Sequence, residues 1–296
     1  MTDLSYRRGS FVSTRPEGLD YDGLPMRLWR KAKTLGVWNP DDIDFSRDRE
    51  DWVRLSDQER DLLLRLTALF MAGEESVTLD LLPLLMVMAR EGRLEEEMYL
   101  TTFLWEEAKH VDFFLGGFLR NVAPDSGDLG RYHVPAWGRI FSRELPEAMN
   151  ALLTDPSPAA QARASVTYNM IVEGVLAETG YEGYFRALER NDLLPGLREG
   201  IGYLKQDESR HLAYGVFLLS RLVARDPSLW EVVEGRMNEL FPLALEMIRE
   251  TFEPYDPVPF GLGMDEFLEI ATTNFSRRIR RVEGARHRSL DEVLAD

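Results

Sequence analysis

Two Glu-x-x-His pairs, each preceded by a further glutamate, constrain the fold of this chain more than any other feature of its sequence. The two sets are Glu74, Glu107 and His110, followed by Glu173, Glu208 and His211. In each set the first glutamate stands 33 or 35 residues before the second, about the length of a helix, a turn and the returning helix. Residues three apart share one face of a helix. The spacing therefore predicts four helices that direct Glu, Glu-x-x-His, Glu and Glu-x-x-His toward two metal ions.

The neighbours of these residues argue that the set is buried rather than solvated. Glu107 lies between Phe103 and Phe114, Glu173 stands in the apolar run YNMIVEGVLAE, and His211 precedes LAYGVFLLSRLV. An isolated Glu-x-x-His on a helix is usually a solvated pair, but glutamate is seldom buried unless it is paired or bound to metal. Four buried carboxylates would repel one another, whereas two divalent cations would neutralise them. Carboxylates with imidazoles favour iron or manganese over zinc or copper, and such a metal pair indicates oxidation chemistry.

Composition excludes several classes of protein. Cysteine is absent, which removes disulfides, thiolate metal sites and cysteine nucleophiles. The net charge of −16 argues against nucleic acid as a partner. The N-terminal residues lack the apolar core of a secretory signal, and no run of about 18 apolar residues would span a membrane. We therefore expect a cytoplasmic protein that does not span a membrane.

Helical periodicity dominates the chain and no strand pattern is convincing. Residues 1–55 read as irregular, except for a short helix near 26–35, and the charged tail 284–296 is expected to be mobile. Ser56 and Glu59 form a capping box ahead of a long helix, which Pro83 should kink or break. Further helices are predicted over 95–122, 138–153, 159–190, 194–224, 227–252 and 265–283. The 296 residues permit one large domain or two small ones, and the shared core favours a single domain over 1–296.

At this point the sequence resembles the ferritin-like superfamily and, within it, the small subunit of ribonucleotide reductase. The segment WNPDDIDFSRDREDW, which begins at Trp38, is similar to the Trp-x-Pro-x-x-x-Asp segment of that subunit. Asp207 occupies the place of an aspartate that serves electron transfer together with the tryptophan. The resemblance covers roughly residues 25 to 225. It implies an all-α fold, a ferritin-like four-helix bundle with additional helices, and an electron-transfer role for Trp38 and Asp207.

Two departures separate the chain from most reductase subunits. Phe114 stands four residues after the first histidine, where those subunits carry a radical tyrosine. No tyrosine follows Tyr255, although the reductase subunit relays its radical through a tyrosine in the tail. Glu74 also replaces the usual aspartate, as in the manganese/iron variant of the reductase. These departures are shared with the related ligand-binding oxidases, which hold a mixed manganese/iron pair.

Two further motifs are similar to those of the ligand-binding oxidases: GEESV at 73–77 and ASVTYNMIVEG at 164–174. In that group a valine becomes bonded to a tyrosine, and Val77 and Tyr168 occupy those positions. Val77 is three residues after Glu74 and so shares its helical face. Tyr168 is five residues before Glu173, roughly 140° around an α-helix, so α-helical periodicity alone would not select it. Without the resemblance, both would be read as core residues.

The resemblance implies an oxidase that reduces dioxygen at a manganese/iron pair, with two irons as the alternative, and oxidises an aliphatic C–H bond. Manganese would be held by Glu74, Glu107 and His110, and iron by Glu173, Glu208 and His211. At least one Glu-x-x-His carboxylate should bridge the ions. The resemblance also implies a bound long-chain fatty acid, a Val77–Tyr168 ether and a homodimer, with an electron donor that the sequence does not identify. The alternatives are a manganese/iron-type ribonucleotide reductase small subunit and a metal-storage or peroxide-detoxifying protein.

Overall fold

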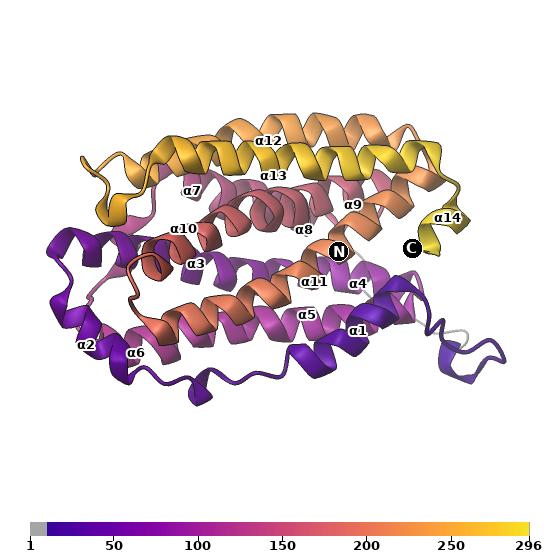
Figure 1. The fold of residues 1–296 in the computed structure, drawn as a ribbon. Coiled ribbons are helices and arrows are strands. Elements are labelled where there is room, and N and C mark those ends of the chain that lie inside the picture. The colour runs from indigo at the N-terminus through magenta and orange to yellow at the C-terminus, as the bar shows by residue number, and fades with distance from the viewer. Residues whose placement is uncertain (1–10, 296) are drawn as a thin grey trace.

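The computed structural model describes residues 11–295, and these residues form helices with no strand. The all-α prediction is confirmed. Figure 1 shows the helices running largely alongside one another. The α-helices are α1 (Leu24–Leu35), α2 (Ser46–Arg54), α3 (Asp57–Asp80), α4 (Leu82–Arg90), α5 (Leu94–Asp112), α6 (Arg120–Val122), α7 (Pro135–Arg139), α8 (Leu145–Ala151), α9 (Pro158–Ser165), α10 (Glu178–Glu189), α11 (Pro195–Arg225), α12 (Leu229–Phe252), α13 (Met264–Glu283) and α14 (Leu290–Leu294).

Three π-helical segments interrupt or connect these α-helices. They are Phe113–Leu119, Ile140–Glu144 and Val166–Ala177. The first continues α5 into α6, and the third joins α9 to α10 into one long helical rod. Short 3₁₀ turns occupy Val12–Thr14, Pro40–Asp42, Leu129–Tyr132, Pro259–Gly261 and Gly284–His287.

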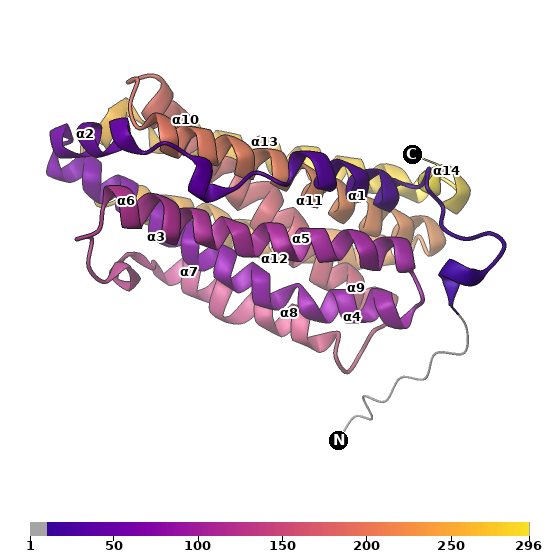
Figure 2. The same cartoon turned by 90° about the horizontal axis from the view of Figure 1, so that it is seen from below.

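Four helical rods form the centre of the molecule: α3, α5, α9–α10 with its π segment, and α11. The π segment packs on α11, and α3 packs on α5. The helices α12 and α13 cover the π segment, and α1 lies along α5 and α11 (Figures 1 and 2). The buried apolar side chains of these helices form one contiguous cluster. No helix within residues 11–295 combines the length and apolar character needed to cross a bilayer.

Local signals explain the helix boundaries around the first ligand. Ser56 accepts the Glu59 backbone N–H, and the Glu59 side chain accepts the Ser56 backbone N–H, so the predicted capping box begins α3. The helix ends at Asp80, and Pro83 stands in the first turn of α4, where its missing N–H costs nothing. The predicted break at Pro83 is therefore present.

The segment read as irregular contains a second helix, α2, which the sequence did not predict. Its sequence, SRDREDWVR, lacks the apolar periodicity of a packed helix. It is instead held by acidic side chains: Asp48 accepts the backbone N–H groups of Gly196 and Leu197, and Asp51 accepts that of Leu194. These carboxylates satisfy the free N–H groups at the start of α11, where the helix dipole also favours negative charge.

The C-terminal tail, expected to be mobile, contains two short helical elements. Residues 284–287 form a 3₁₀ turn, and Ser289 and Glu292 form a capping box that begins α14. Val293 and Ala285 are buried. This segment packs mainly against α11.

Candidate metal centre

The structure brings all six predicted ligands together in the centre of the bundle. Glu74 comes from α3, the first Glu-x-x-His pair from α5, Glu173 from the π segment, and the second pair from α11. Every one of these side chains is buried, and the most exposed residue, Glu208, is only 7% exposed. They form two overlapping groups whose candidate ligand atoms lie within 4.8 Å of one another. The groups are Glu74, Glu107, His110 and Glu208, and Glu107, Glu173, Glu208 and His211.

Glu107 and Glu208 belong to both groups, and their two oxygens point to different histidines. The Nδ1 atom of His110 lies 3.5 Å from Glu107 Oε2 and 3.4 Å from Glu208 Oε1. The Nδ1 atom of His211 lies 3.4 Å from Glu107 Oε1 and 3.4 Å from Glu208 Oε2. Each carboxylate thus has one oxygen near each histidine, an arrangement that would suit a ligand shared by two metal ions. In both histidines, the nitrogen that faces the carboxylates is Nδ1.

The donor set fits two metal ions better than it fits an ordinary hydrogen-bonded core. Four buried atoms of these residues have no hydrogen-bond partner: Glu107 Oε2, Glu173 Oε1, Glu208 Oε2 and His211 Nδ1. A buried polar atom without a partner costs about 1–3 kcal/mol, and more if it is charged. Metal coordination would satisfy all four atoms at once, and the mixture of four carboxylates with two imidazoles suits iron or manganese.

Electrostatics lead to the same conclusion. Burial raises the pKa of Glu173 well above its ordinary value, and the nearby Glu208 carboxylate adds to the shift. Burial likewise raises the pKa of Glu74, opposed in part by a hydrogen bond from His110. Burial alone would lower the pKa of His211, but the surrounding carboxylates, with Glu208 first, raise it instead. Without metal, protons must therefore supply the positive charge that neutralises the site.

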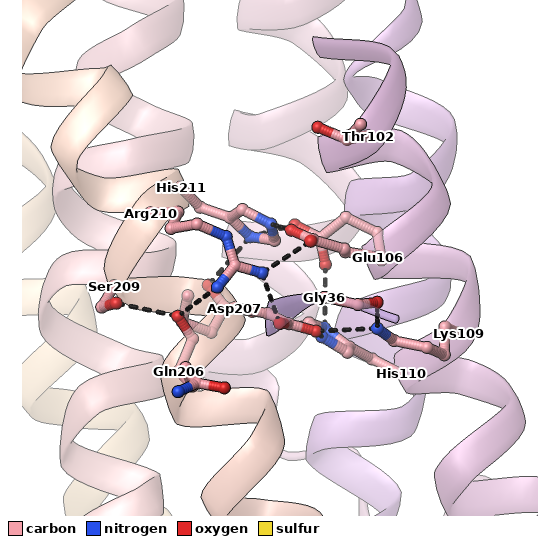
Figure 3. Close-up of polar contacts among 12 residues, drawn as sticks. Gly36, Thr102, Glu106, Lys109, His110, Gln206, Asp207, Ser209, Arg210 and His211 are labelled. Atoms are coloured by element: carbon pink, nitrogen blue, oxygen red, sulfur yellow. Dashed lines mark hydrogen bonds and ion pairs between the residues drawn. The ribbon is translucent and has the colours of Figure 1, made fainter. Parts of the chain in front are cut away.

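A second layer of charged residues holds the outer nitrogens of the two histidines. The Nε2 atom of His110 lies 3.3 Å from Asp207 Oδ2, and the Nε2 atom of His211 lies 2.9 Å from Glu106 Oε2. Arg210 joins these two carboxylates by donating to Glu106 at 2.6 Å and to Asp207 at 2.5 Å (Figure 3). A carboxylate on the outer nitrogen fixes the imidazole tautomer so that the inner nitrogen is free to bind metal.

Trp38, predicted to act with Asp207, lies directly beside it. The Trp38 Nε1–H donates to Asp207 Oδ2 at 2.8 Å, and the same oxygen approaches His110. Lys109 pairs with Asp207 at 3.0 Å and donates to the backbone carbonyl of Gly36 at 2.6 Å. A continuous chain of contacts therefore runs from a partly buried indole to one candidate metal ligand.

Tyr168 and Val77 also meet at the centre. The fully buried Tyr168 hydroxyl oxygen lies 3.1 Å from the Val77 backbone carbonyl oxygen and 3.2 Å from Glu107 Oε1, and its single O–H can donate to either. The π-helix explains how Tyr168 reaches the face of Glu173. In a π-helix the backbone hydrogen bonds join residues five apart, which is the spacing of Tyr168 and Glu173. The same segment places the Asn169 side-chain N–H on Glu173 Oε2 at 2.9 Å.

An apolar cavity of about 90 Å³ opens onto the candidate metal centre. Its polar floor consists of ligand carboxylates, namely Glu74, Glu107, Glu173 and Glu208. Its walls are apolar side chains from α3, the π segment, α12 and α13, among them Phe70, Val172, Leu176, Met247 and Phe267. Such walls suit a ligand with an apolar body.

Comparison with known proteins identifies the family. The sequence-family model of the ribonucleotide reductase small chain matches residues 26–118. Solved structures of R2-like ligand-binding oxidases align with nearly the whole chain. A glycine-to-leucine variant with an anaerobically reconstituted Mn/Fe cofactor is 38% identical, with a TM-score of 0.88 and coverage of 93% of this chain and 98% of its own. The chain belongs to the R2-like ligand-binding oxidase family.

Two further structures of R2-like ligand-binding oxidase variants give the same result. A valine-to-leucine variant with an aerobically reconstituted Mn/Fe cofactor is 37% identical, with a TM-score of 0.87 and coverage of 93% of this chain and 99% of its own. A tyrosine-to-phenylalanine variant with an anaerobically reconstituted Mn/Fe cofactor is 39% identical, with a TM-score of 0.86 and coverage of 93% and 98%. The match therefore extends over the ferritin-like core and the flanking helices of this oxidase.

Three charged residues beside the ligands of this oxidase were not predicted from the sequence: Glu106, Lys109 and Arg210. Each is buried, although a charged residue next to a ligand on a helix would normally face solvent. A signal was present in the repetition of an acidic residue directly before each Glu-x-x-His. Glu106 precedes Glu107, and Asp207 precedes Glu208, and each supports the histidine of the opposite helix.

Proposed function

We propose that this protein is a manganese/iron oxidase that uses dioxygen for the two-electron oxidation of an aliphatic C–H bond. The donor set and the Mn/Fe cofactors of the related oxidases support this assignment. Manganese is assigned to Glu74, Glu107 and His110, and iron to Glu173, Glu208 and His211, with Glu107 and Glu208 shared between the ions. When bound, the metal pair would supply a site for dioxygen reduction and one electron from each divalent ion.

The observation that carries the proposal is the position of the Tyr168 phenol. Its oxygen lies between the backbone of Val77 and a carboxylate that faces both histidines. An ether between Val77 and Tyr168 would remove one C–H hydrogen and one O–H hydrogen, which releases two electrons and two protons. With the two metal electrons and two protons from solvent, these reduce one dioxygen to two waters.

Oxygen uptake tests the oxidase directly. Protein loaded anaerobically with Mn(II) and Fe(II) should consume about one dioxygen per metal pair on its first exposure, which an oxygen electrode measures. The Glu107→Ala, Glu208→Ala double variant should consume little, because both shared carboxylates are gone. Wild-type protein that holds both metals but consumes no dioxygen would contradict the proposal.

The cavity is proposed to hold a long-chain fatty acid whose carboxylate reaches the metals. Apolar walls support this orientation, because no cationic side chain within residues 11–295 lines the cavity and the bound metals would supply the positive charge that attracts the carboxylate. The cavity volume is below the roughly 300–1,000 Å³ of typical small-molecule sites. A long chain would therefore displace side chains such as Phe70 and Met247.

Solvent extraction and mass spectrometry of the purified protein test this ligand. Wild-type protein should release a long-chain carboxylic acid. Gly73→Leu should release much less, because a side chain at Gly73 would extend toward Phe141 in the cavity wall. Gly235→Leu is the matched control, since a Cβ there meets no atom within 4 Å. Equal release from both variants would place the acid outside this cavity.

Trp38 and Asp207 are proposed to carry electrons toward the centre. The hydrogen bond from the indole to Asp207 and the contact of Asp207 with His110 support this path.

A manganese/iron-type ribonucleotide reductase subunit is the alternative function. Such a subunit would need a residue to carry the radical across to a large subunit, and no tyrosine follows Tyr255. Tyr255 itself is buried, and its hydroxyl donates to Asp61 at 2.6 Å and accepts from Arg65. We therefore expect no nucleotide reduction with any ribonucleotide reductase large subunit. Measurable turnover would favour the alternative.

A homodimer is proposed as the working form. Exposed apolar side chains on three neighbouring helices support this. They are Leu79 on α3, Leu82 and Met86 on α4, and Trp105 on α5. Light scattering coupled to size-exclusion chromatography measures the mass, and Trp105→Glu should shift a dimer toward monomer.

A further inference from the structure

A groove separate from the metal-centre cavity is lined by residues of α11, α13 and the C-terminal helix α14. Figure 1 shows where these three helices lie. Its volume is about 720 Å³. Five arginines line it, and no acidic side chain does: Arg277, Arg278, Arg280, Arg281 and Arg288. In a chain whose net charge is −16, such a concentration of positive charge is a local exception.

Not all of this charge is used within the protein. Arg278 pairs with Glu178 at 2.5 Å, and Arg277 approaches the same carboxylate at 3.7 Å. Arg280 donates to the backbone carbonyl of Ser276, and neither Arg280 nor Arg281 has a carboxylate within ion-pair distance among residues 11–295. At least two guanidinium groups are therefore available to an external anion.

The deepest arginine also has an unused donor. The Arg278 side chain is only 11% exposed, and its buried Nε–H has no hydrogen-bond partner. It reaches this depth because Gly174 leaves space: a Cβ there would lie 3.1 Å from Leu212 and 3.4 Å from Arg278 Nε. This Nε–H has almost no accessible surface, so an external anion would meet the exposed guanidinium groups of Arg280 and Arg281 first.

The floor of the groove is apolar. Leu212, Ala213 and Val216 line it from α11, Leu24 from the start of α1, and Val293 from α14. Arginine is well suited to phosphate, because its planar fork donates two parallel hydrogen bonds to neighbouring oxygens. An anion with an apolar body would satisfy both surfaces.

We propose that this groove binds a small molecule that carries a phosphate group on an apolar body, either free in solution or as a lipid headgroup. A nucleic acid fits less well, because the positive charge is confined to one groove while the rest of the acidic protein would repel a long polyanion. The proposal does not rest on the oxidase chemistry, since none of the metal ligands lines the groove.

Calorimetric titration of the full-length, metal-loaded protein at 150 mM salt tests the proposal with two soluble probes, inorganic phosphate and octyl phosphate. Octyl phosphate should bind at least tenfold more tightly than phosphate, because its alkyl chain covers the apolar floor. Arg280→Gln with Arg281→Gln should weaken octyl phosphate at least tenfold, and the corresponding lysine pair should give an intermediate loss. The matched control, Arg54→Gln with Arg143→Gln, removes the same charge from other exposed positions and should change binding less than twofold.

Vesicles distinguish the two sources of phosphate. Sedimentation measures binding to anionic phosphatidylglycerol vesicles and to phosphatidylcholine vesicles. The ligand is a lipid headgroup if the protein binds the anionic vesicles and this binding depends on Arg280 and Arg281. Binding of octyl phosphate without vesicle binding indicates a soluble ligand. Gly73→Leu, which fills the cavity at the metal centre, should leave octyl phosphate binding unchanged. The proposal is wrong if neither probe saturates, if the control pair weakens binding equally, if Gly73→Leu abolishes it, or if an oligonucleotide binds more tightly than octyl phosphate.

Discussion

Replacing Glu106 by glutamine should weaken one half of the metal centre and leave the other half nearly intact. The Glu106 carboxylate accepts from His211 Nε2 at 2.9 Å and from Arg210 at 2.6 Å, so it holds His211 with its Nδ1 atom facing inward. A glutamine of the same shape has only one acceptor oxygen. If that oxygen accepts from Arg210, the amide N–H faces His211 Nε2 and favours the tautomer protonated on the inner nitrogen.

Loss of such a partner commonly costs 10- to 100-fold in metal affinity, which corresponds to about 1.4–2.8 kcal/mol. Asp207→Asn provides the mirror test, because Asp207 contacts His110 in the same way. Anaerobic Mn(II) titration against a fluorescent chelator should show one weakened and one near-normal site in each variant. Combining Glu106→Gln with His211→Ala should produce no further loss beyond His211→Ala alone.

The control for this experiment is thermal stability, since Arg210 keeps its contact with Asp207 in the Glu106→Gln variant. A change in affinity below twofold, or an equal loss at both sites, would refute the idea that each histidine is held by the acidic residue of the opposite pair.

Three further predictions test packing, electrostatics and metal content. Gly200→Ala should destabilise the fold by about 1–3 kcal/mol, because its Cβ would lie 1.9 Å from the Phe113 ring. Gly202→Ala, with open space at its Cβ, should be neutral or stabilising by up to about 1 kcal/mol, as chemical denaturation measures. The melting temperature of metal-free protein should fall as pH rises above 6.5. The pKa values of Glu74, Glu173 and the two ligand histidines are raised by folding, so the folded state holds more protons than the unfolded state and loses stability as they are released. The melting temperature of metal-loaded protein should depend less on pH. Elemental analysis should find about two transition ions per chain, lost together in the Glu107→Ala, Glu208→Ala double variant.

The candidate ligands could be predicted because they obey α-helical spacing. A Glu-x-x-His pair places both side chains on one face, and the 33- and 35-residue gaps match helices that return to the same depth. Glu74, Glu107 and His110 therefore converge with their counterparts without any knowledge of the loops. The break at Pro83 followed equally from the chemistry of proline.

Tyr168 could not be placed by the same argument, because its segment is a π-helix. The apolar sequence VTYNMIVEGVLA carries no local mark of π-helical hydrogen bonding, and only the resemblance pointed to Tyr168. Glu106 and Arg210 were missed for a different reason. Their burial depends on each other and on Asp207 across two helices, which is a tertiary property that neither helix shows alone.

The helical structure of the C-terminal tail could not be predicted from the sequence either. The charged residues 284–296 suggested a mobile tail, whereas Val293 is buried and lines the groove from α14. One buried side chain in a short charged helix is too weak a pattern to outweigh its charge.

The most direct test of the account is the mass of the protein before and after it meets dioxygen. Metal-free protein loaded with iron and manganese and then exposed to air should lose two hydrogens per chain, about 2 Da by the balance of C–H and O–H hydrogens lost. After proteolysis, one branched peptide should join the segment with Val77 to the segment with Tyr168. Tyr168→Phe keeps all six metal ligands, so it should bind both metals and give no branched peptide. If wild-type protein consumes dioxygen at the metals while its Val77 and Tyr168 peptides always separate, the proposed cross-link chemistry is wrong and the reductase alternative gains support.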